Sequence, residues 1–237
     1  MYSYLFMDIV LLILWVGTWL IIPKKTILRK QMLWSSFILV PVGLTDYFFI
    51  PEYWHPKSIF SIAGISPEAL LFCFGAGGLA AVCYELLFNL RIRKTTRKKR
   101  IIHWLLPIII IFSGLTTSYL YHFNIMYDVL IALTIGTIYL LIIRSDLIKQ
   151  LFIGGTIFSV IYILVFGLTL KIDPNFVNQW SLHNLSGRFI LDIPVEEIYW
   201  AFLFGAIWAV VFEDIKDYKT VRAPEPELER VPIDRMC

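Results

Sequence analysis

The sequence predicts an all-α integral membrane protein with seven transmembrane helices. Of its 237 residues, 58% are hydrophobic and 16% are charged, whereas a soluble domain has about 25% charged residues. The apolar residues form uninterrupted stretches of about 20, the length that a helix needs to cross about 30 Å of hydrocarbon. Because lipid offers the backbone no hydrogen-bond partners, these stretches must be helical.

The predicted spans are separated by short connections, and each is a continuous apolar stretch. They are 3–22, 31–50, 67–90, 101–122, 124–143, 147–170 and 194–213. The first is interpreted as a retained helix, since it has no preceding basic region and no small-residue cleavage site, and its apolar run is too long for a signal peptide. Basic residues concentrate in the alternate loops 23–30, 91–100 and 144–149. The positive-inside rule therefore predicts a multi-pass protein of the cell membrane, with its N-terminus outside and its C-terminus in the cytoplasm.

The end of the chain differs from the rest in composition. Residues 218–237 are polar and contain Pro224 and Pro226, with too little apolar surface to fold alone, so we expect a disordered cytoplasmic tail. The three cysteines have neither a disulfide pattern nor a metal-type spacing. We expect no metal site and no nucleic-acid partner.

Two parts of the chain resemble each other. Residues 65–72 align with 193–200 without a gap, which pairs Glu68 with Glu196, and at the same offset Glu85 pairs with Glu213. Shorter matches lie upstream: Met7-Asp8-Ile9-Val10-Leu11 with Tyr127-Asp128-Val129-Leu130-Ile131, and Asp46 and Trp54 with Asp173 and Trp180. Internal repeats are common in membrane folds.

The alignment predicts two parallel three-helix repeats joined by one helix. The first repeat, with its basic cytoplasmic loop, is residues 1–100, the connecting helix is 101–122, and the second repeat is 123–217. A single connecting helix gives both repeats the same orientation. Most of the matched polar residues then lie at the outer side, where they could form one site.

Three carboxyl groups are the candidate catalytic residues. Glu68, Glu196 and Glu197 each lie in the first turn of a predicted span. Acids at membrane depth are costly and are often functional, although a glutamate in a first turn is also favoured by the helix dipole. Because only one of the adjacent pair Glu196 and Glu197 caps the helix well, this pair favours a functional interpretation.

Aromatic and acidic residues near these glutamates are candidate substrate-binding residues. Trp200 lies one turn after Glu196 and Glu197, and aromatic faces stabilise cations, although aromatic residues also pack in any membrane helix. The substrate-binding candidates are Asp46, Trp54, Phe72, Asp173, Trp180 and Trp200. For the two loop tryptophans, an interfacial anchor is the alternative.

The sequence resembles the membrane-embedded lycopene cyclase domain family, here as a fused pair over residues 2–215. The family motif is similar to Asp192-Ile193-Pro194-Val195-Glu196-Glu197, and the first repeat has Gly64-Ile65-Ser66-Pro67-Glu68-Ala69. The first repeat departs from the motif, because its proline is shifted by one position and Ala69 replaces the second glutamate.

The resemblance implies a carotenoid cyclase, an intramolecular lyase or isomerase that closes a ring at the end of a linear polyene without redox change. It implies that Glu196 and Glu197 serve as acid and base in an order left open, with Glu68 in support and with Trp200 and Phe72 stabilising the carbocation. We expect no cofactor. The implied partners are a lipophilic polyene substrate and membrane lipid, and the resemblance also allows a homo- or hetero-oligomer with other carotenoid enzymes.

Two alternatives belong to other functional classes. Small parallel-repeat transporters share the three-plus-one-plus-three layout, but they resemble repeats with a Pro-Gln step, which this sequence lacks. The other alternative is a non-catalytic partner subunit of a pigment enzyme. The missing second glutamate at Ala69 leaves this alternative open.

Overall fold

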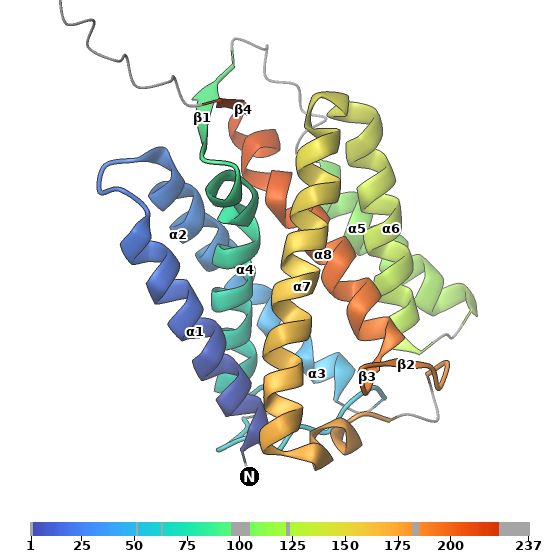
Figure 1. Ribbon diagram of the computed structural model, residues 1–237. Coiled ribbons are helices and arrows are strands. Elements are labelled where there is room, and N and C mark those ends of the chain that lie inside the picture. The colour runs from blue at the N-terminus through green and yellow to red at the C-terminus, as the bar shows by residue number, and fades with distance from the viewer. Residues whose placement is uncertain are drawn as a thin grey trace, which may run out of the picture.

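The structure is a computed structural model that describes residues 2–50, 52–62, 64–95, 105–121, 124–181 and 185–222. It is a bundle of helices (Figure 1). Six helical segments are long and apolar enough to cross a membrane: Ser3–Ile21, Ile27–Phe49, Pro67–Leu87, Ile125–Ile143, Ser145–Ile172 and Val195–Lys216. The helix Leu105–Tyr121 is apolar but shorter. A helical membrane protein is therefore confirmed, while the count of seven spans stays a prediction.

The longer helices are connected by short irregular segments, single 3-10 turns and small strands. In chain order the helices and strands are α1 (Ser3–Ile21), α2 (Ile27–Leu39), α3 (Asp46–Phe49), α4 (Pro67–Leu87), β1 (Leu90–Lys94), α5 (Leu105–Tyr121), α6 (Ile125–Ile143), α7 (Ile148–Ile172), β2 (Phe189–Ile190), β3 (Ile193–Pro194), α8 (Val195–Lys216) and β4 (Tyr218–Arg222). The 3-10 turn Val40–Thr45 joins α2 to α3, so the predicted span 31–50 changes its helical geometry near Pro41.

Local sequence signals fix the ends of the helices that carry the candidate glutamates. The Ser66 hydroxyl accepts a hydrogen bond from the Ala69 amide at 3.2 Å, and Pro67 occupies the first helical position of α4. Both features are typical of a helix N-terminus. The helix α8 ends at Asp217, which adopts a left-handed conformation with φ of 59°.

Helices α4 and α8 are the most buried helices of the bundle. The helix α4 packs against α1, α2, α7 and α8, and α8 also packs against α6 and α7. Gly77 permits the close approach of α2, because a Cβ atom there would lie 2.8 Å from the Ser35 carbonyl oxygen. On α8, a Cβ atom at Gly205 would lie 2.6 Å from the Phe158 Cβ of α7. Small residues at such contacts are typical of membrane helix pairs.

A two-stranded antiparallel sheet closes one end of the bundle. Strand β1 pairs with β4, so that Ile92 lies opposite Thr220. Ile92 is buried between the helix ends, while Arg91 and Arg93 are exposed. The prediction of a disordered tail from residue 218 is therefore wrong for Tyr218–Arg222. These residues are ordered because they pair with β1, a strand within the segment that was predicted as a basic loop. The remaining tail, 223–237, lies outside the described residues.

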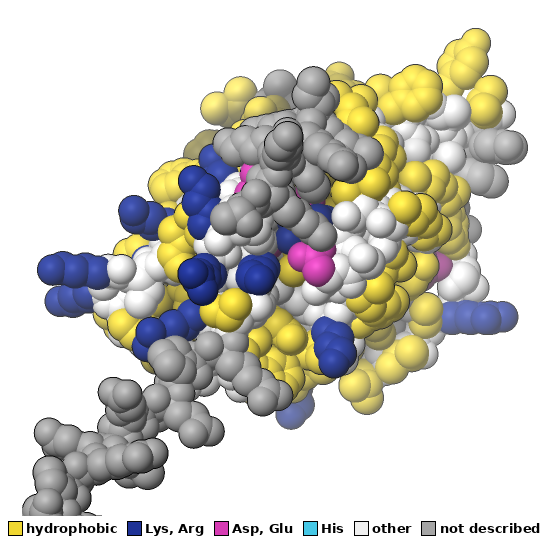
Figure 2. All heavy atoms as spheres, turned by 90° about the horizontal axis from the view of Figure 1, so that it is seen from above, with side chains coloured by type: hydrophobic (Ala, Val, Ile, Leu, Met, Phe, Trp, Pro, Cys, Tyr) yellow, Lys and Arg dark blue, Asp and Glu magenta, His cyan; other side chains and the backbone are white. Residues whose placement is uncertain are grey.

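Basic side chains gather at the end of the bundle that carries this sheet. Figure 2 shows this end, with Lys and Arg side chains spread across it. The exposed ones belong to the α1–α2 connection, the start of α2, β1, the start of α7, the end of α8 and β4: Lys24, Lys25, Lys30, Arg91, Arg93, Lys94, Lys149, Lys216 and Lys219. The candidate glutamates lie toward the opposite end, where α4 and α8 begin (Figure 1).

Candidate functional site

Two loops from distant parts of the chain pair at the end of the bundle opposite the basic face. Trp54 and Trp180 form an antiparallel bridge, in which the His55 amide donates to the Gln179 carbonyl at 2.6 Å and the Ser181 amide donates to the Tyr53 carbonyl at 2.8 Å. The two indole rings lie 5.5 Å apart between centroids, and both are buried. The structure therefore brings the two predicted tryptophans together in a pair of loops that covers the ends of the helices.

Glu197 is buried next to these paired loops. It accepts hydrogen bonds from the Tyr53 hydroxyl, the Tyr162 hydroxyl and, at 2.8 Å, the Trp180 indole nitrogen. These donors come from the loop after α3, from α7 and from the loop before α8. An ionised carboxylate is a pure acceptor, and this arrangement suits one, because three donors converge on its two oxygens.

Tyr53 is the donor that the first half of the chain supplies. Burial raises the pKa of its hydroxyl well above the usual range, and the nearby Glu197 raises it further. Tyr53 therefore keeps its proton and remains a donor to Glu197.

Glu196 has different partners from its neighbour. It accepts a hydrogen bond from the Ser186 amide at 2.7 Å and one from the Tyr127 hydroxyl at 3.1 Å. Its second oxygen is buried and has no partner among the described residues. The two adjacent glutamates thus occupy separate environments, with Glu197 against the paired loops and Glu196 toward α6.

Glu68 is fully buried at the start of α4. One oxygen accepts a hydrogen bond from the Ile59 amide at 2.8 Å, and the other has no partner in the described part of the chain. Because Ser66 already caps α4, Glu68 is not needed as a cap. Ala69, which occupies the position matched to Glu197, is buried.

A set of aromatic rings joins the two halves next to these carboxyl groups. The Phe72 ring lies 5.9 Å from Trp200 and 6.4 Å from Tyr162, measured between centroids, and Tyr162 lies 5.6 Å from Trp200. Trp200 stacks on Phe204 at 5.1 Å. The predicted residues Phe72 and Trp200 are therefore neighbours and contact the tyrosine that donates to Glu197.

The two predicted aspartates lie apart. The Asp46 carboxyl faces the Trp54 indole and lies close enough to Glu68 for their charges to interact. Asp173 follows α7 and accepts hydrogen bonds from the Ser3 hydroxyl and, at 3.1 Å, from the Asn175 amide. The bond from Ser3 lowers the pKa of Asp173. Asp173 thus ties the end of α7 to the start of α1, and none of its described hydrogen bonds reaches the glutamates.

Sequence reasoning singled out neither Tyr162 nor Asp8. Tyr162 is a polar-tipped residue in the middle of a predicted span, a signal that could have identified it. Asp8 lies in α1 with 0% of its surface exposed, close to Asp46 and Glu68. It was noted only as part of the repeat, although an acid in an otherwise uncharged apolar helix is a signal in itself.

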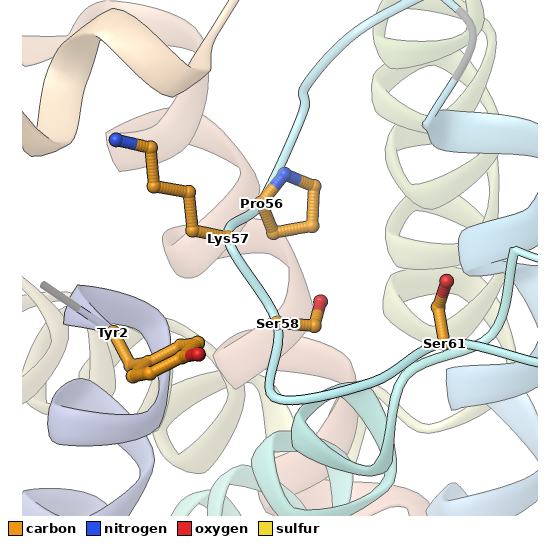
Figure 3. A pocket seen from close by; sticks show the side chains of 5 residues that line it. All are labelled: Tyr2, Pro56, Lys57, Ser58 and Ser61. Atoms are coloured by element: carbon orange, nitrogen blue, oxygen red, sulfur yellow. The ribbon is translucent and has the colours of Figure 1, made fainter.

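An open cavity of about 580 Å³ lies beside the paired loops and is lined by Tyr2, Pro56, Lys57, Ser58 and Ser61 (Figure 3). Figure 3 shows the Lys57 and Ser61 side chains extending from the loop that follows Trp54. None of the predicted site residues lines this cavity, and its polar walls do not suit a hydrocarbon. The candidate catalytic residues Glu68, Glu196 and Glu197 are instead buried within the protein.

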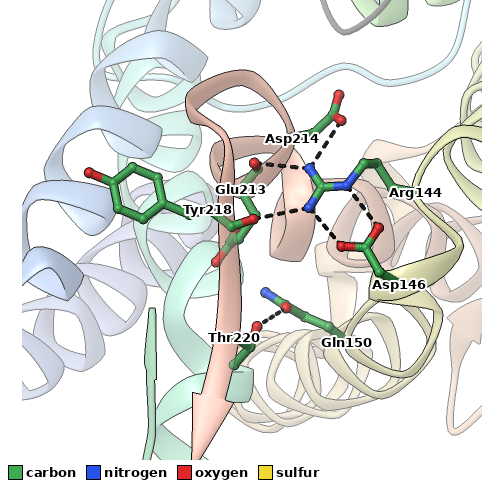
Figure 4. A network of polar contacts seen from close by, with 7 residues as sticks. All are labelled: Arg144, Asp146, Gln150, Glu213, Asp214, Tyr218 and Thr220. Carbon is green, nitrogen blue, oxygen red and sulfur yellow. Dashed lines mark hydrogen bonds and ion pairs between the residues drawn. The ribbon is translucent and has the colours of Figure 1, made fainter. Parts of the chain in front are cut away.

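A second polar network lies at the basic end of the bundle (Figure 4). The Arg144 guanidinium contacts Asp146 at 3.1 Å and Asp214 at 3.3 Å, and donates to the Glu213 and Tyr218 carbonyl oxygens at 3.0 Å. This network links the α6–α7 connection to α8 and β4. It has no described contact with the Glu197 site, and its role is to hold these elements together.

The bundle of apolar helices, with buried carboxyl groups and aromatic rings between its two halves, defines a helical membrane protein with an enclosed acidic site. A family model described as lycopene cyclase matches residues 124–215. The lycopene cyclase domain family is therefore what this part of the chain, from the start of α6 to the end of α8, is similar to. The match includes Glu196, Glu197 and Trp200. Comparisons with curated proteins and with solved structures gave no match.

Proposed function

We propose that this protein is a carotenoid cyclase that closes a ring at the end of a linear, lycopene-type polyene within the membrane. The observation that carries the proposal is the environment of Glu197. This buried carboxyl lies within the segment that matches the lycopene cyclase family and receives three hydrogen-bond donors, of which Tyr162 packs against Trp200 and Phe72.

The proposed reaction is an isomerisation and needs no electron acceptor. An acid protonates the terminal double bond, the carbocation closes a six-membered ring, and a base removes a proton. Aromatic faces such as those of Trp200 and Phe72 stabilise a cation electrostatically, more strongly where water is excluded. In this proposal Glu196, Glu197 and Glu68 supply the proton-transfer groups, and Trp54, Trp180 and Asp46 complete the enclosure. The chemistry uses no nucleotide or metal.

We also propose that the chain is an internal duplication with its N-terminus outside and its C-terminus in the cytoplasm. The concentration of exposed Lys and Arg at one end supports this orientation (Figure 2). Matched packing supports the duplication, because Gly77 admits α2 against α4 as Gly205 admits α7 against α8. The polyene substrate would reach the site from the lipid.

Expression in bacteria that accumulate lycopene tests the function, with the extracted pigments analysed by chromatography and absorption spectrum. We expect monocyclic or bicyclic products from the wild-type chain, and their loss in Glu197→Gln. A matched control is Glu52→Gln, the same change at an exposed position near the same end. Unchanged lycopene, with the wild-type protein shown to be folded in the membrane, would contradict the proposal.

A further inference from the structure

The buried carboxyl groups near the site differ in how many hydrogen-bond donors they receive. Glu197 receives three. Asp8, with 0% of its surface exposed, receives none from the described residues at either oxygen. Glu197 is therefore surrounded as an anion would be, whereas no hydrogen bond from the described residues stabilises a negative charge on Asp8.

Among the described residues, no Lys, Arg or His is found to interact with Asp8. The carboxyl groups of Glu68 and Asp46 lie close enough for their charges to interact with Asp8, as do the Tyr4 hydroxyl and the Cys73 thiol. Helices α1, α3 and α4 contain no Lys, Arg or His, and the basic residues of α7 lie near its two ends, at Lys149 and Lys171. An isolated charge in such a place is costly. The neutral acid is the stable form of Asp8, and a neutral acid carries a proton to donate.

Aromatic contacts connect Asp8 to the site that contains Glu197. Tyr4 lies one turn before Asp8, and its ring packs edge-on against Trp54 at 4.5 Å and lies 6.4 Å from Phe72. On the other side, Phe72 contacts Tyr162, which donates to Glu197. One group of rings therefore leads from Tyr4, the neighbour of Asp8 on α1, to Tyr162, which donates to Glu197, and the two acids come from different halves of the chain.

We propose that Asp8 is the catalytic acid and that Glu197 is the catalytic base. This inference rests on the proposed cyclase function and revises its set of proton-transfer groups, because Asp8 takes the place of Glu196 and Glu68 as the acid and Glu197 is kept as the base. It also accounts for Ala69, because the first half contributes its carboxyl from α1 and does not need a second glutamate on α4.

The proposed reaction conserves atoms and protons. Asp8 breaks its O–H bond and gives the proton to the terminal double bond, which forms a C–H bond and leaves a carbocation. The neighbouring double bond closes the ring through a new C–C bond, and Glu197 takes a proton from the adjacent carbon to leave a ring double bond. The substrate keeps its composition. Exchange with water at the helix ends returns a proton to Asp8 and removes one from Glu197.

The first test uses a matched pair of variants, Asp8→Asn and Asp128→Asn. Asp128 is the residue of α6 that aligns with Asp8, and it faces Thr117 and Ser118 instead of the aromatic group. We expect Asp8→Asn to lower turnover of lycopene at least about 100-fold, the usual contribution of a general acid, and Asp128→Asn to retain turnover. Wild-type turnover in Asp8→Asn would overturn the assignment.

A second substrate separates an acid from a residue that only maintains the fold. A polyene that ends in an epoxide is protonated more readily than one that ends in a double bond. Asp8→Asn should therefore recover much of its turnover on the epoxide, whereas Glu197→Gln should not. Equal losses on both substrates in Asp8→Asn would show a structural role and overturn the assignment.

An infrared difference spectrum distinguishes failure of this inference from failure of the proposed function. The full-length protein in lipid should show the carbonyl stretch of a neutral carboxylic acid that is absent from Asp8→Asn, whatever the substrate. If wild type converts lycopene but this band is unchanged by the substitution, Asp8 is not the acid. If the band is present but wild type converts neither polyene, the cyclase function and the catalytic role fall together.

Discussion

Gln31 and Gln150 make the same pair of hydrogen bonds from opposite halves of the chain. The Gln31 side-chain amide donates to the Ala81 carbonyl at 2.7 Å and to Glu213 at 3.0 Å. The Gln150 amide donates to the Ala209 carbonyl and to Glu85, both at 2.6 Å. Each glutamine thus binds the backbone of one central helix and the carboxyl group of the other.

This reciprocal arrangement explains why Glu85 and Glu213 are tolerated in the interior. Both are fully buried, and their carboxyl groups contact each other. A hydrogen bond between two carboxyl groups requires a proton on one of them, and the glutamines satisfy one oxygen of each. The four side chains join α2, α4, α7 and α8 at the end opposite the catalytic candidates.

Removal of either glutamine should destabilise the bundle. We expect Gln31→Leu and Gln150→Leu each to lower the free energy of unfolding by about 1–3 kcal/mol, because a buried carboxyl oxygen loses its donor. Thermal unfolding in detergent would measure this loss. The double variant should lose less than the sum, since the two sites share the Glu85 and Glu213 contact. A loss confined to one of the two variants would contradict the reciprocal arrangement.

The donors to Glu197 should control activity more than stability. Each of Tyr53→Phe and Tyr162→Phe removes one hydrogen bond to the carboxylate and should lower turnover about 10- to 100-fold, since a bond to a charged group contributes about 1.5–3 kcal/mol. Conversion of lycopene in isolated membranes is the measurement. Tyr199→Phe is the control, because this tyrosine of α8 is exposed and its hydroxyl contacts Thr134 instead. Full activity in both variants would show that Glu197 does not act as an anion.

Arg144 should be the most sensitive basic residue for folding. Its side chain is 2% exposed and contacts two carboxyl groups and two carbonyl oxygens (Figure 4). Replacement by Met should destabilise the protein by about 3–5 kcal/mol, because the buried ion pair with Asp214 and the guanidinium's other contacts are lost. Lys149→Met at an exposed position provides the control and should change the melting temperature little. Equal melting temperatures for the two variants would contradict this role.

The close contact between α2 and α4 at Gly77 should not accommodate an added methyl group. Gly77→Ala places a Cβ atom against the Ser35 carbonyl, and overpacking of this kind costs about 1–3 kcal/mol. Gly17→Ala is a suitable comparison, since nothing lies within 4 Å of a Cβ atom there. We expect reduced yield and a lower melting temperature for the first variant alone. Indistinguishable behaviour would mean that α2 and α4 pack less closely.

The sequence located the apolar helices and the residues of the first turns because both signals are local. Stretches of about 20 apolar residues mark the long helices, and Ser66 and Pro67 mark the start of α4. The contacts of Glu197 could not be predicted in this way, because Tyr53 and Tyr162 are distant in sequence and belong to different elements. No periodicity relates them to α8.

Strand β1 was missed for a different reason. Leu90 and Ile92 alternate with Arg91 and Arg93, which is the pattern of a half-buried strand. The density of charge hid this pattern and favoured a plain loop. Its partner β4 was missed because pairing with β1, and not its own composition, orders it.

The pairing of Trp54 with Trp180 is made through backbone amides and carbonyls, so it constrains side-chain identity weakly. The pairing of these two loops can therefore persist while each half accumulates its own substitutions, such as Ala69 in place of a second glutamate. Under the proposed duplication and cyclase function, a symmetric ancestor can in this way become an asymmetric catalyst over generations, in which each half specialises and neither half alone inherits the complete reaction.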